Sequence, residues 1–249
     1  MSMVNIFKRV MKQKVLIVII SIFFSITGCQ SSKKPEWKYP LEKVERLNSP
    51  LVEVEPFVFN GEFYLLESWR SDWDWPGQPN KEAGKNNEIW IAKLPNGPES
   101  YDKRNYISCA LKGNIFGTAI VWEDRVYVFG TNEASGLQYV EMTWSEDLIN
   151  WSAPVKVFDS PVGNIYNVSL TRDENGFVFQ WETNEVGTYF TMCFGHIDKL
   201  TDNWNENVIE HALYGQDKYT GGPQVIYANG WYYLLYLERL ENGWETRVT

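Results

Sequence analysis

Apolar and polar residues alternate along most of this 249-residue chain, and short turn signals separate the alternating stretches. Such alternation is typical of β-strands, whereas the spacing of apolar residues that marks amphipathic helices is nearly absent. One hairpin pattern recurs along the chain, as VFNGEFYLLES (58–68), VWEDRVYVFGT (121–131), DENGFVFQWET (173–183) and YANGWYYLLYL (227–237). The recurrence has a period of about 50 to 60 residues, which is typical of the blades of a β-propeller.

Further strand patterns fill the sequence between these hairpins. QYVEMTWSED and WSAPVKVFD follow the second hairpin, and TYFTMCFGHID and ENVIEHA follow the third. In each pair a turn with a leucine and a tryptophan, Trp151 or Trp204, joins the two strands, and we expect these large side chains to wedge between blades. We therefore predict an all-β fold, a β-propeller of four-stranded antiparallel blades over residues 38–249.

Three stretches of the chain carry a resemblance to a known superfamily. SEDLINW, EPFVFNGEFYLLES and GGPQVIYANGWYYLLYLE resemble turn and blade-opening motifs of the five-bladed propeller glycoside hydrolases, families 43 and 32. The resemblance covers Pro50 to Thr249 and implies a blade of the five-bladed type. The repeats supply about four blades, and the last of these ends in its third strand at WETRVT. We therefore expect a domain that is truncated at its C-terminus; the alternative is a ring that closes with fewer blades.

The N-terminal residues have the pattern of an export signal. Within residues 1–28, basic side chains precede the apolar stretch Val15–Phe24, which is too short for a comfortable membrane span. The run ITGC that ends at Cys29 resembles the lipobox of bacterial lipoproteins, which implies lipidation of Cys29. The alternatives are an ordinary secretory signal or an N-terminal anchor helix. Residues 29–37 are polar and aperiodic, so we expect a tether that holds the protein at the cell envelope, on the outer membrane or the periplasmic face.

The charge of the chain narrows the class of partners. The net charge is −9 at neutral pH, and residues 1–28 hold basic but no acidic residues, so the remainder is more acidic still. Such a surface repels nucleic acid and anionic lipid headgroups. We expect neutral or cationic partners, no nucleic acid, and contact with a membrane through the lipid anchor only. The sequence does not indicate an oligomeric state.

Cysteine and histidine give no sign of a metal site or a cofactor. Beyond Cys29, only Cys109 and Cys193 remain, each inside an apolar strand pattern, which favours buried thiols over the alternative of a disulfide. His196 and His211 stand without the neighbouring ligands that a zinc site needs. Structural calcium occurs in the axial channel of some of the resembled families, yet no residue here specifies it.

The geometry of a propeller gathers candidate site residues at one face. In an up-and-down blade, the start of the first strand and the loop between the second and third strands lie on the same side. Glu55 should therefore meet the loop that carries Trp69, Trp73 and Trp75. Tryptophan faces stack on sugar C–H surfaces, and carboxylates accept hydrogen bonds from hydroxyl groups. The alternative is a loop whose tryptophans only cover an exposed edge of the core.

The same rule adds acidic and polar residues from other blades. Near the top of the second strands lie Glu67, Gly130, Glu182 and Tyr236, in chain order, and the loops carry Arg70, Asp72, Asp74, Glu133 and Glu185. Any one of these acids can instead be a solvated surface group. What favours a site is that Glu55 and Glu182 come from different blades and should point toward a shared axis. We expect Trp69, Trp73, Trp75, Glu67, Arg70 and Tyr236 to bind the substrate.

Glycoside hydrolysis needs two carboxyl groups, one as the acid and one as the base or nucleophile. In the resembled families the base is the Asp of a D-P opening, a second Asp begins a later blade, and the acid is the Glu of E-G-P. Here Glu55 occupies the base position. The second blade begins with Gly117-Thr118, which offers no acid, and E-G-P is replaced by Gly221-Gly222-Pro223, so the proton donor of the family is missing. We expect Glu182 to take that role, with Asp72 or Asp74 as the next candidates.

Three functions are compatible with these observations. The first is hydrolysis of glycosidic bonds in an envelope-accessible polysaccharide or oligosaccharide by carboxylate general acid/base chemistry. The second, favoured by the missing Glu, is a non-catalytic propeller lipoprotein that binds glycans. The third is an envelope assembly or interaction module, since propellers often present flat protein-binding faces.

Overall fold

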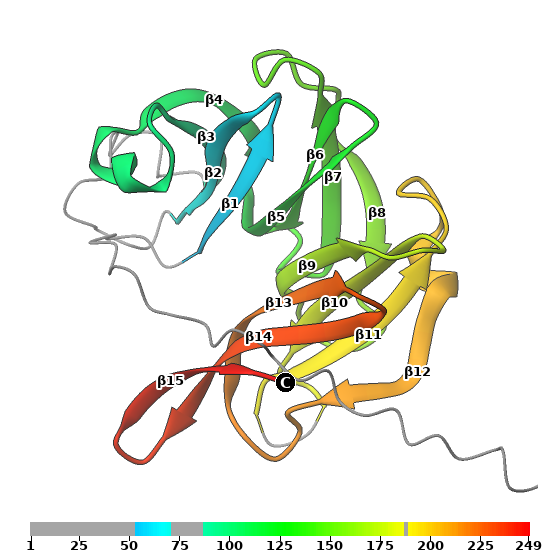
Figure 1. Ribbon diagram of the computed structural model, residues 1–249. Coiled ribbons are helices and arrows are strands. Elements are labelled where there is room, and N and C mark those ends of the chain that lie inside the picture. Colours follow the sequence, from blue (N-terminus) through cyan, green and yellow to red (C-terminus); the bar gives the residue numbers. More distant parts are fainter. Residues whose placement is uncertain (1–52, 71–86, 187–188) are drawn as a thin grey trace, which may run out of the picture. The chain divides into compact units, whose positions relative to one another are not determined.

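A computed structural model describes residues 53–70, 87–186 and 189–249. Within them the chain forms fifteen strands and two short 3-10 helices, Pro98–Lys103 and Trp204–Asn207. The strands build antiparallel sheets in a propeller arrangement, which confirms the predicted fold class (Figure 1). The predicted signal peptide and tether lie outside the described residues. No helix in the described part of the chain combines the length and apolar character that crossing a membrane requires.

Each blade is a sheet whose strands pair in chain order. Blade 1 consists of β1 (Val54–Phe59), β2 (Glu62–Trp69), β3 (Glu88–Leu94) and β4 (Asn105–Lys112). Blade 2 consists of β5 (Asn114–Trp122), β6 (Arg125–Asn132), β7 (Tyr139–Ser145) and β8 (Val155–Asp159). Blade 3 consists of β9 (Tyr166–Arg172), β10 (Phe177–Thr183), β11 (Thr191–Ile197) and β12 (Val208–Tyr214).

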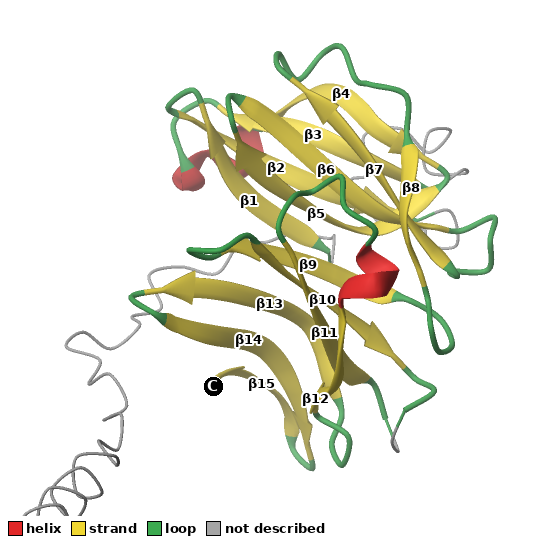
Figure 2. Cartoon of the chain, turned by 90° about the vertical axis from the view of Figure 1, so that its right-hand side faces the viewer, coloured by secondary structure: helices red, strands yellow, loops and turns green. Residues whose placement is uncertain are grey.

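The fourth sheet has three strands among the described residues. Blade 4 consists of β13 (Thr220–Ala228), β14 (Trp231–Leu240) and β15 (Gly243–Val248). The first strands of successive blades are neighbours, because β5 contacts both β1 and β9, and β9 contacts β13. Figure 2 shows the sheets of blades 1 and 2 packed above those of blades 3 and 4. The starts of these first strands therefore meet at one end of the propeller.

The recurring hairpin turns explain why the repeat was visible in the sequence. Asn60-Gly61, Glu123-Asp124 and Asn229-Gly230 all have positive φ at both central residues, the conformation of a type I′ turn. This turn matches the twist of the two strands that it joins, and it fixes their register, so that Phe57 lies opposite Tyr64. A two-residue turn therefore sets which side chains of each hairpin face the neighbouring blade.

Aromatic side chains fill the space between blades. Trp204 is fully buried, and its ring lies 5.3 Å from that of Phe129 in blade 2 and 4.7 Å from that of Phe179 in blade 3. Trp151 is half buried at the junction of blades 1 and 2, where its Nε1 donates a 2.9 Å hydrogen bond to Oγ of Ser108. The wedging role predicted for these two tryptophans is confirmed.

The two cysteines of the propeller are free thiols. Cys193 on β11 is buried and Cys109 on β4 is half buried. Burial raises the pKa of the Cys193 thiol to about 11 and that of Cys109 to about 12. Both groups stay protonated near neutral pH, so neither is a nucleophile. The prediction of a buried thiol is confirmed for Cys193, Cys109 is only half buried, and the alternative of a disulfide between them is wrong.

Candidate functional site

Three first strands bend sharply where they reach the shared end of the propeller. Phe116, Asn167 and Gly222 have positive φ values of 56°, 43° and 57°, and the strand pairing of each blade shifts register close to them. Such bulges re-aim side chains and are frequent beside active sites. A positive φ is uncommon for Asn and an outlier for Phe. The backbone is thus distorted at equivalent places in three blades, and all three residues line the same pocket.

This top pocket has a volume of about 670 Å³ and is bordered by all four blades. Two carboxylates and one guanidinium line it, Glu53, Glu182 and Arg70. Aromatic rings supply most of the remaining wall, from Phe116, Tyr166, Phe190, Tyr219 and Trp244. A volume of this order fits a drug-sized ligand, and aromatic walls with a few convergent polar groups are typical of small-molecule sites.

Glu182 is the chemically distinctive group of the top pocket. Its side chain is almost fully buried, and its Oε2 accepts a 2.6 Å hydrogen bond from Nδ2 of Asn167. Its Oε1 has no hydrogen-bond partner within the described residues. Burial raises the pKa of Glu182 to about 8, and the negative charge of Glu53 adds to the rise. A carboxyl with these properties is protonated at neutral pH and can donate a proton to a bound ligand.

A smaller cavity of about 110 Å³ lies along the propeller axis and is lined by the first strands of all four blades. Glu55 on β1 lines it, and one of its carboxylate oxygens accepts a 3.2 Å hydrogen bond from the backbone N–H of Ala119. Burial raises the pKa of Glu55 to about 7, although the neighbouring Thr118, Ala119 and Gln224 lower it in part. Glu55 is therefore a carboxyl that changes its charge near neutral pH.

The two cavities adjoin each other. Glu53, Asn167 and Gly222 line both of them. The structure thus brings Glu55 and Glu182 to neighbouring hollows at one end of the propeller. Glu53 was not among the residues that we singled out from the sequence. Glu53 directly precedes β1 and lies two residues before Glu55. The expectation that residues at the start of each first strand meet at one face would have included Glu53 if it had also covered the residue before the strand.

Arg70 is a second predicted residue that reaches the top pocket. Its guanidinium carbon lies 5.3 Å from the centre of the Phe116 ring. This contact joins the end of β2 in blade 1 to the start of β5 in blade 2. A cationic group on an aromatic wall can bind hydroxyl or carboxylate oxygens of a ligand.

Glu67 and Trp69 lie outside both cavities. Glu67 is fully buried and forms an ion pair with Arg104 at 2.7 Å, and the Tyr106 hydroxyl donates a hydrogen bond to it. Trp69 is 1% exposed, and its ring stacks on that of Trp90 at 4.8 Å. The structure places both residues in packing within blade 1, and it does not bring them to the pocket that contains Glu182.

Tyr236 also lies away from the top pocket. It is buried between blades 3 and 4, where its hydroxyl lies 2.8 Å from that of Tyr214 and accepts a hydrogen bond from Lys218. Glu133 and Glu185 are exposed, and neither lines the two cavities. Trp73, Trp75, Asp72 and Asp74 lie outside the described residues, so their roles remain predictions.

The glycines at the openings of blades 2 and 4 differ in the space that they leave for a side chain. A Cβ atom on Gly117 would lie 2.6 Å from Cδ1 of Ile89 and 3.0 Å from the carbonyl oxygen of Phe129, so that position has no room for a side chain. A Cβ atom on Gly221 would meet only the ring of Tyr219, at 3.3 Å. The acid missing from blade 2 is thus excluded by packing, whereas the acid missing from blade 4 is not.

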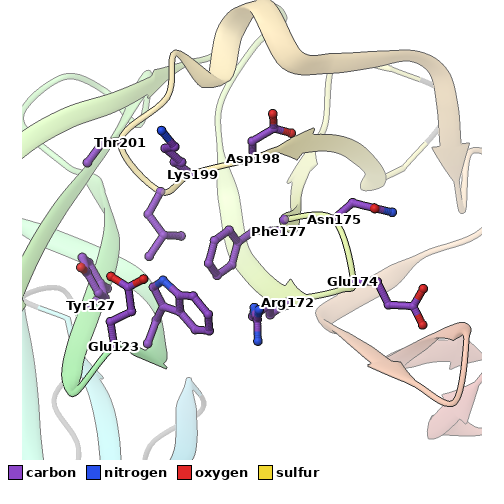
Figure 3. A pocket seen from close by; sticks show the side chains of 12 residues that line it. Glu123, Tyr127, Arg172, Glu174, Asn175, Phe177, Asp198, Lys199 and Thr201 are labelled. Carbon is purple, nitrogen blue, oxygen red and sulfur yellow. The ribbon is translucent and has the colours of Figure 1, made fainter.

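A third hollow, of about 460 Å³, lies at the opposite end of blades 2 and 3 (Figure 3). Trp122, at the far end of β5 from Phe116, forms one wall, and the guanidinium carbon of Arg172 lies 3.8 Å from the centre of its indole. Figure 3 shows Phe177 pointing into this hollow, whereas Glu174 and Asn175 point away from it. Its acids are at the solvated rim, in contrast to the buried Glu182 of the top pocket.

Metal-ligating side chains do not cluster in the described part of the chain. No group of three or more His, Cys, Asp or Glu residues there is arranged to hold a metal ion. His196 instead contacts the buried Asp173, with 3.0 Å between Nε2 and Oδ2. The structural calcium discussed for the resembled families stays a prediction without assigned residues among those that the structure describes.

The fold is similar to those of solved glycoside hydrolases. A thermostable family-43 glycoside hydrolase aligns with a TM-score of 0.56 over 78% of this chain and 69% of its own, at 12% identity. The family-43 endo-arabinanase from Bacillus licheniformis aligns with a TM-score of 0.54 over 79% of this chain and 71% of its own, at 11% identity. An exo-1,5-α-L-arabinanase from a bovine ruminal metagenomic library gives the same TM-score and coverages at 12% identity.

At these identities the likeness shows a shared fold. The resemblance that the blade-opening motifs indicated is therefore confirmed at the level of the fold. No protein family model and no curated protein sequence matches the chain.

Proposed function

We propose that the protein is a glycoside hydrolase-like enzyme that binds a glycan in the top pocket and cleaves a glycosidic bond there. The observation that carries this proposal is Glu182. It is a buried carboxyl with a pKa raised to about 8 by its surroundings, and it lies in a pocket walled by aromatic rings. Structural neighbours that are glycoside hydrolases support the same class of reaction.

Glu182 takes the role of the general acid. Cleavage of a glycosidic bond requires a proton on the leaving oxygen, and a carboxyl that is still protonated at neutral pH can supply it. The Asn167 amide fixes Oε2, whereas Oε1 is buried and has no hydrogen-bond partner within the described residues. After proton transfer, the carboxylate that forms is stabilised by the Asn167 hydrogen bond and by the backbone of Gly222.

Glu55 takes the role of the base or nucleophile. It occupies the position of the base in the resembled families. Because its pKa is raised to about 7, its carboxylate form predominates only when the pH is above that value. The N–H of Ala119 holds the carboxylate toward the axial cavity, which adjoins the pocket of Glu182. Glycosidases use such a pair, with one carboxyl protonated and the other ionised.

The walls of the top pocket suit a sugar. Aromatic rings supply faces for the C–H surface of pyranose or furanose rings, and Glu53 and Arg70 supply an acceptor and donors for hydroxyl groups. A lipid anchor at Cys29, which remains a prediction, would place this pocket at the cell envelope. Under that arrangement the substrate is a polysaccharide or oligosaccharide that reaches the envelope.

The test is hydrolysis of a panel of glycans by the full chain. Arabinan and arabino-oligosaccharides belong in the panel because neighbours of the same fold are arabinanases. Glu182→Gln and Glu55→Gln should each lose at least about a hundredfold in rate, the usual size of general acid–base catalysis. Glu185→Gln, which changes an exposed acid outside both cavities, is the matched control. Unchanged hydrolysis by Glu182→Gln would refute the assignment.

A second function, glycan binding without turnover, is favoured by one observation. Gly221 stands where the resembled families carry their acid, although a side chain there would need only a small shift of the Tyr219 ring. Binding of a glycan by wild-type protein, measured by calorimetry, without release of any sugar would support this function over hydrolysis. Absence of both binding and hydrolysis across the panel would refute both and leave an interaction module.

A further inference from the structure

Five aromatic rings of the top pocket form an unbroken series of contacts. The centroid distances are 5.5 Å for Phe116–Tyr166, 4.9 Å for Tyr166–Phe190, 5.4 Å for Phe190–Tyr219 and 5.0 Å for Tyr219–Trp244. Successive rings meet edge to face, with interplanar angles between 62° and 89°. We call this series the aromatic arc. It begins in blade 2, crosses blade 3 and ends on β15 of blade 4.

Exposure rises along the aromatic arc from one end to the other. Phe116 is 6% exposed, the three middle rings are half buried, and Trp244 is 53% exposed. The buried end lies beside Asn167 and Glu182, at the proposed reaction centre. The arc therefore leads from the buried acid to the solvent.

The outer end of the aromatic arc is held in place by main-chain and side-chain contacts. The backbone N–H of Arg239 donates a 3.2 Å hydrogen bond to the carbonyl oxygen of Tyr219. The guanidinium carbon of Arg239 lies 5.9 Å from the centre of the Trp244 ring, and the two residues are paired across β14 and β15. Tyr189, which is 47% exposed, adds a ring 6.5 Å from that of Tyr219. The exposed rings thus form an ordered surface.

The exposed Trp244 ends a continuous aromatic wall, and contiguous exposed apolar surface marks ligand-binding grooves. Burial of apolar surface drives folding, and an ordered exposed indole forgoes that gain. A single sugar unit covers one or two rings, so a monosaccharide at Glu182 would not reach Trp244. A pocket of about 670 Å³ has the volume for a ligand of a few sugar units.

We infer that the aromatic arc is a binding track for an oligosaccharide of about three or more sugar units, with its outer unit on Trp244. This inference rests on the proposed function and adds the length of the chain that the site takes. The reacting bond lies beside Glu182, and the more distant units bind along Phe190, Tyr219 and Trp244. Binding energy from these remote units then holds the bond at the buried acid.

The experiment measures affinity against chain length. Arabino-, xylo- and gluco-oligosaccharides of two to six units are titrated by calorimetry into the full chain carrying Glu182→Gln, so that no ligand is cleaved. We expect affinity to rise about tenfold from the disaccharide to the tetrasaccharide of the series that binds, which corresponds to one stacked ring. Adding Trp244→Ala should abolish this rise and leave the disaccharide affinity unchanged.

The matched control is Trp231→Ala. Trp231 lies on the same sheet, at the other end of β14, and lines neither cavity of the proposed site. It should keep the dependence on length, and thermal unfolding should show that both variants are folded. Equal affinity for all lengths, or a length dependence that survives Trp244→Ala, would overturn the binding track while leaving the proposed function intact. Absence of binding at every length would overturn both the binding track and the proposed function. This outcome differs from failure of the binding track alone, because the disaccharide then does not bind either.

Discussion

Asn167 and Glu182 face each other across β9 and β10, with 2.6 Å between Nδ2 of the amide and Oε2 of the carboxyl. The pairing of the two strands shifts register between Gln180 and Glu182, so that Glu182 lies opposite Tyr166. The positive φ of Asn167 accompanies this bulge. The extra residue of this bulge lies on β9, so the distortion re-aims the side chain of Asn167, which holds the Glu182 carboxyl at the top pocket.

Replacement of Asn167 by glycine should alter the acidity of Glu182 without straining the backbone. Glycine adopts a φ of 43° readily, whereas alanine would not. The amide hydrogen bond lowers the pKa of Glu182, so its loss should raise that pKa further above about 8. We expect the alkaline limb of the pH–rate profile to move upward by a fraction of a pH unit. An unchanged or lowered limb would contradict the role of Asn167.

The rate of hydrolysis should depend on pH as a narrow bell. In the proposed mechanism Glu55, as the base, must be ionised, which requires a pH above its pKa of about 7. Glu182, as the proposed acid, must be protonated, which requires a pH below its pKa of about 8. We therefore expect kcat/KM to be greatest between these two values. The measurement is kcat/KM across the range from about pH 5 to about pH 10, and a maximum near pH 5 would be incompatible with these assignments.

Stability should also depend on the two carboxyl groups. Both have native pKa values raised above the ordinary value of 4.5, so the native state binds more protons than the unfolded state between pH 4.5 and the native values. The free energy of unfolding should therefore fall as pH rises from about 4.5 to about 8, by up to about 1.4 kcal/mol per pH unit for each carboxyl.

Chemical denaturation of wild type and of Glu55→Gln/Glu182→Gln across this range tests the linkage. Because glutamine does not titrate, the double variant should gain stability relative to wild type as pH increases. A constant difference between the two proteins would show that neither carboxyl is perturbed in the native state.

The ion pair between Arg104 and Glu67 should matter for folding and not for ligand binding. Arg104→Leu leaves a fully buried carboxylate without its charge partner, which should cost about 3 kcal/mol or more. Arg125→Leu, which removes the partner of the exposed Glu146, is the control and should change stability little. Glycan affinity should be the same in both variants, and a selective loss of affinity in Arg104→Leu would return Glu67 to the binding site.

A carboxyl placed at residue 221 should partly replace Glu182. A Cβ atom on Gly221 would meet only the ring of the half-buried Tyr219, at 3.3 Å, so a small shift of that ring makes room for it. Gly221 lines the top pocket and occupies the position of the acid in the resembled families. We expect Glu182→Gln/Gly221→Glu to recover part of the hydrolysis lost in Glu182→Gln. Recovery should be absent with Gly221→Gln, which has the same size and no acid. Equal rates for the two double variants would indicate that the pocket does not use a carboxyl from this strand.

Much of the fold follows from local features that are visible in the sequence. The turns at Asn60-Gly61 and Asn229-Gly230, the alternation on either side and the tryptophans after the third strands of blades 2 and 3 all reflect short-range geometry. Glu55 lies at a blade opening and is found by the same reasoning. Its environment, including Thr118 and Gln224 from other blades, depends on the assembled ring and is not visible locally.

The second-strand positions show where sequence reasoning ended. Glu67 and Glu182 are equivalent in the repeat, yet Glu67 pairs in regular register with Val54 and stays on the side of Arg104. The strand β10 that carries Glu182 also keeps regular register with β11, and the extra residue of the blade 3 bulge lies on β9. The two carboxyls therefore differ in their neighbours, Arg104 beside Glu67 and Asn167 of the bulged strand beside Glu182. The sequence carries only a weak sign of that bulge, the tolerance of Asn167 for positive φ. The aromatic arc joins residues from separate blades and has no local signature.

The most direct test of the central claim compares leaving groups in Glu182→Gln. A general acid is needed when the leaving oxygen is a poor leaving group, and it is hardly needed for a dinitrophenyl glycoside, which departs without protonation. We predict that Glu182→Gln lowers kcat/KM by at least about a hundredfold for the natural glycan and only slightly for the dinitrophenyl glycoside of the same sugar. An equal loss on both substrates, or no loss on either, would contradict the account.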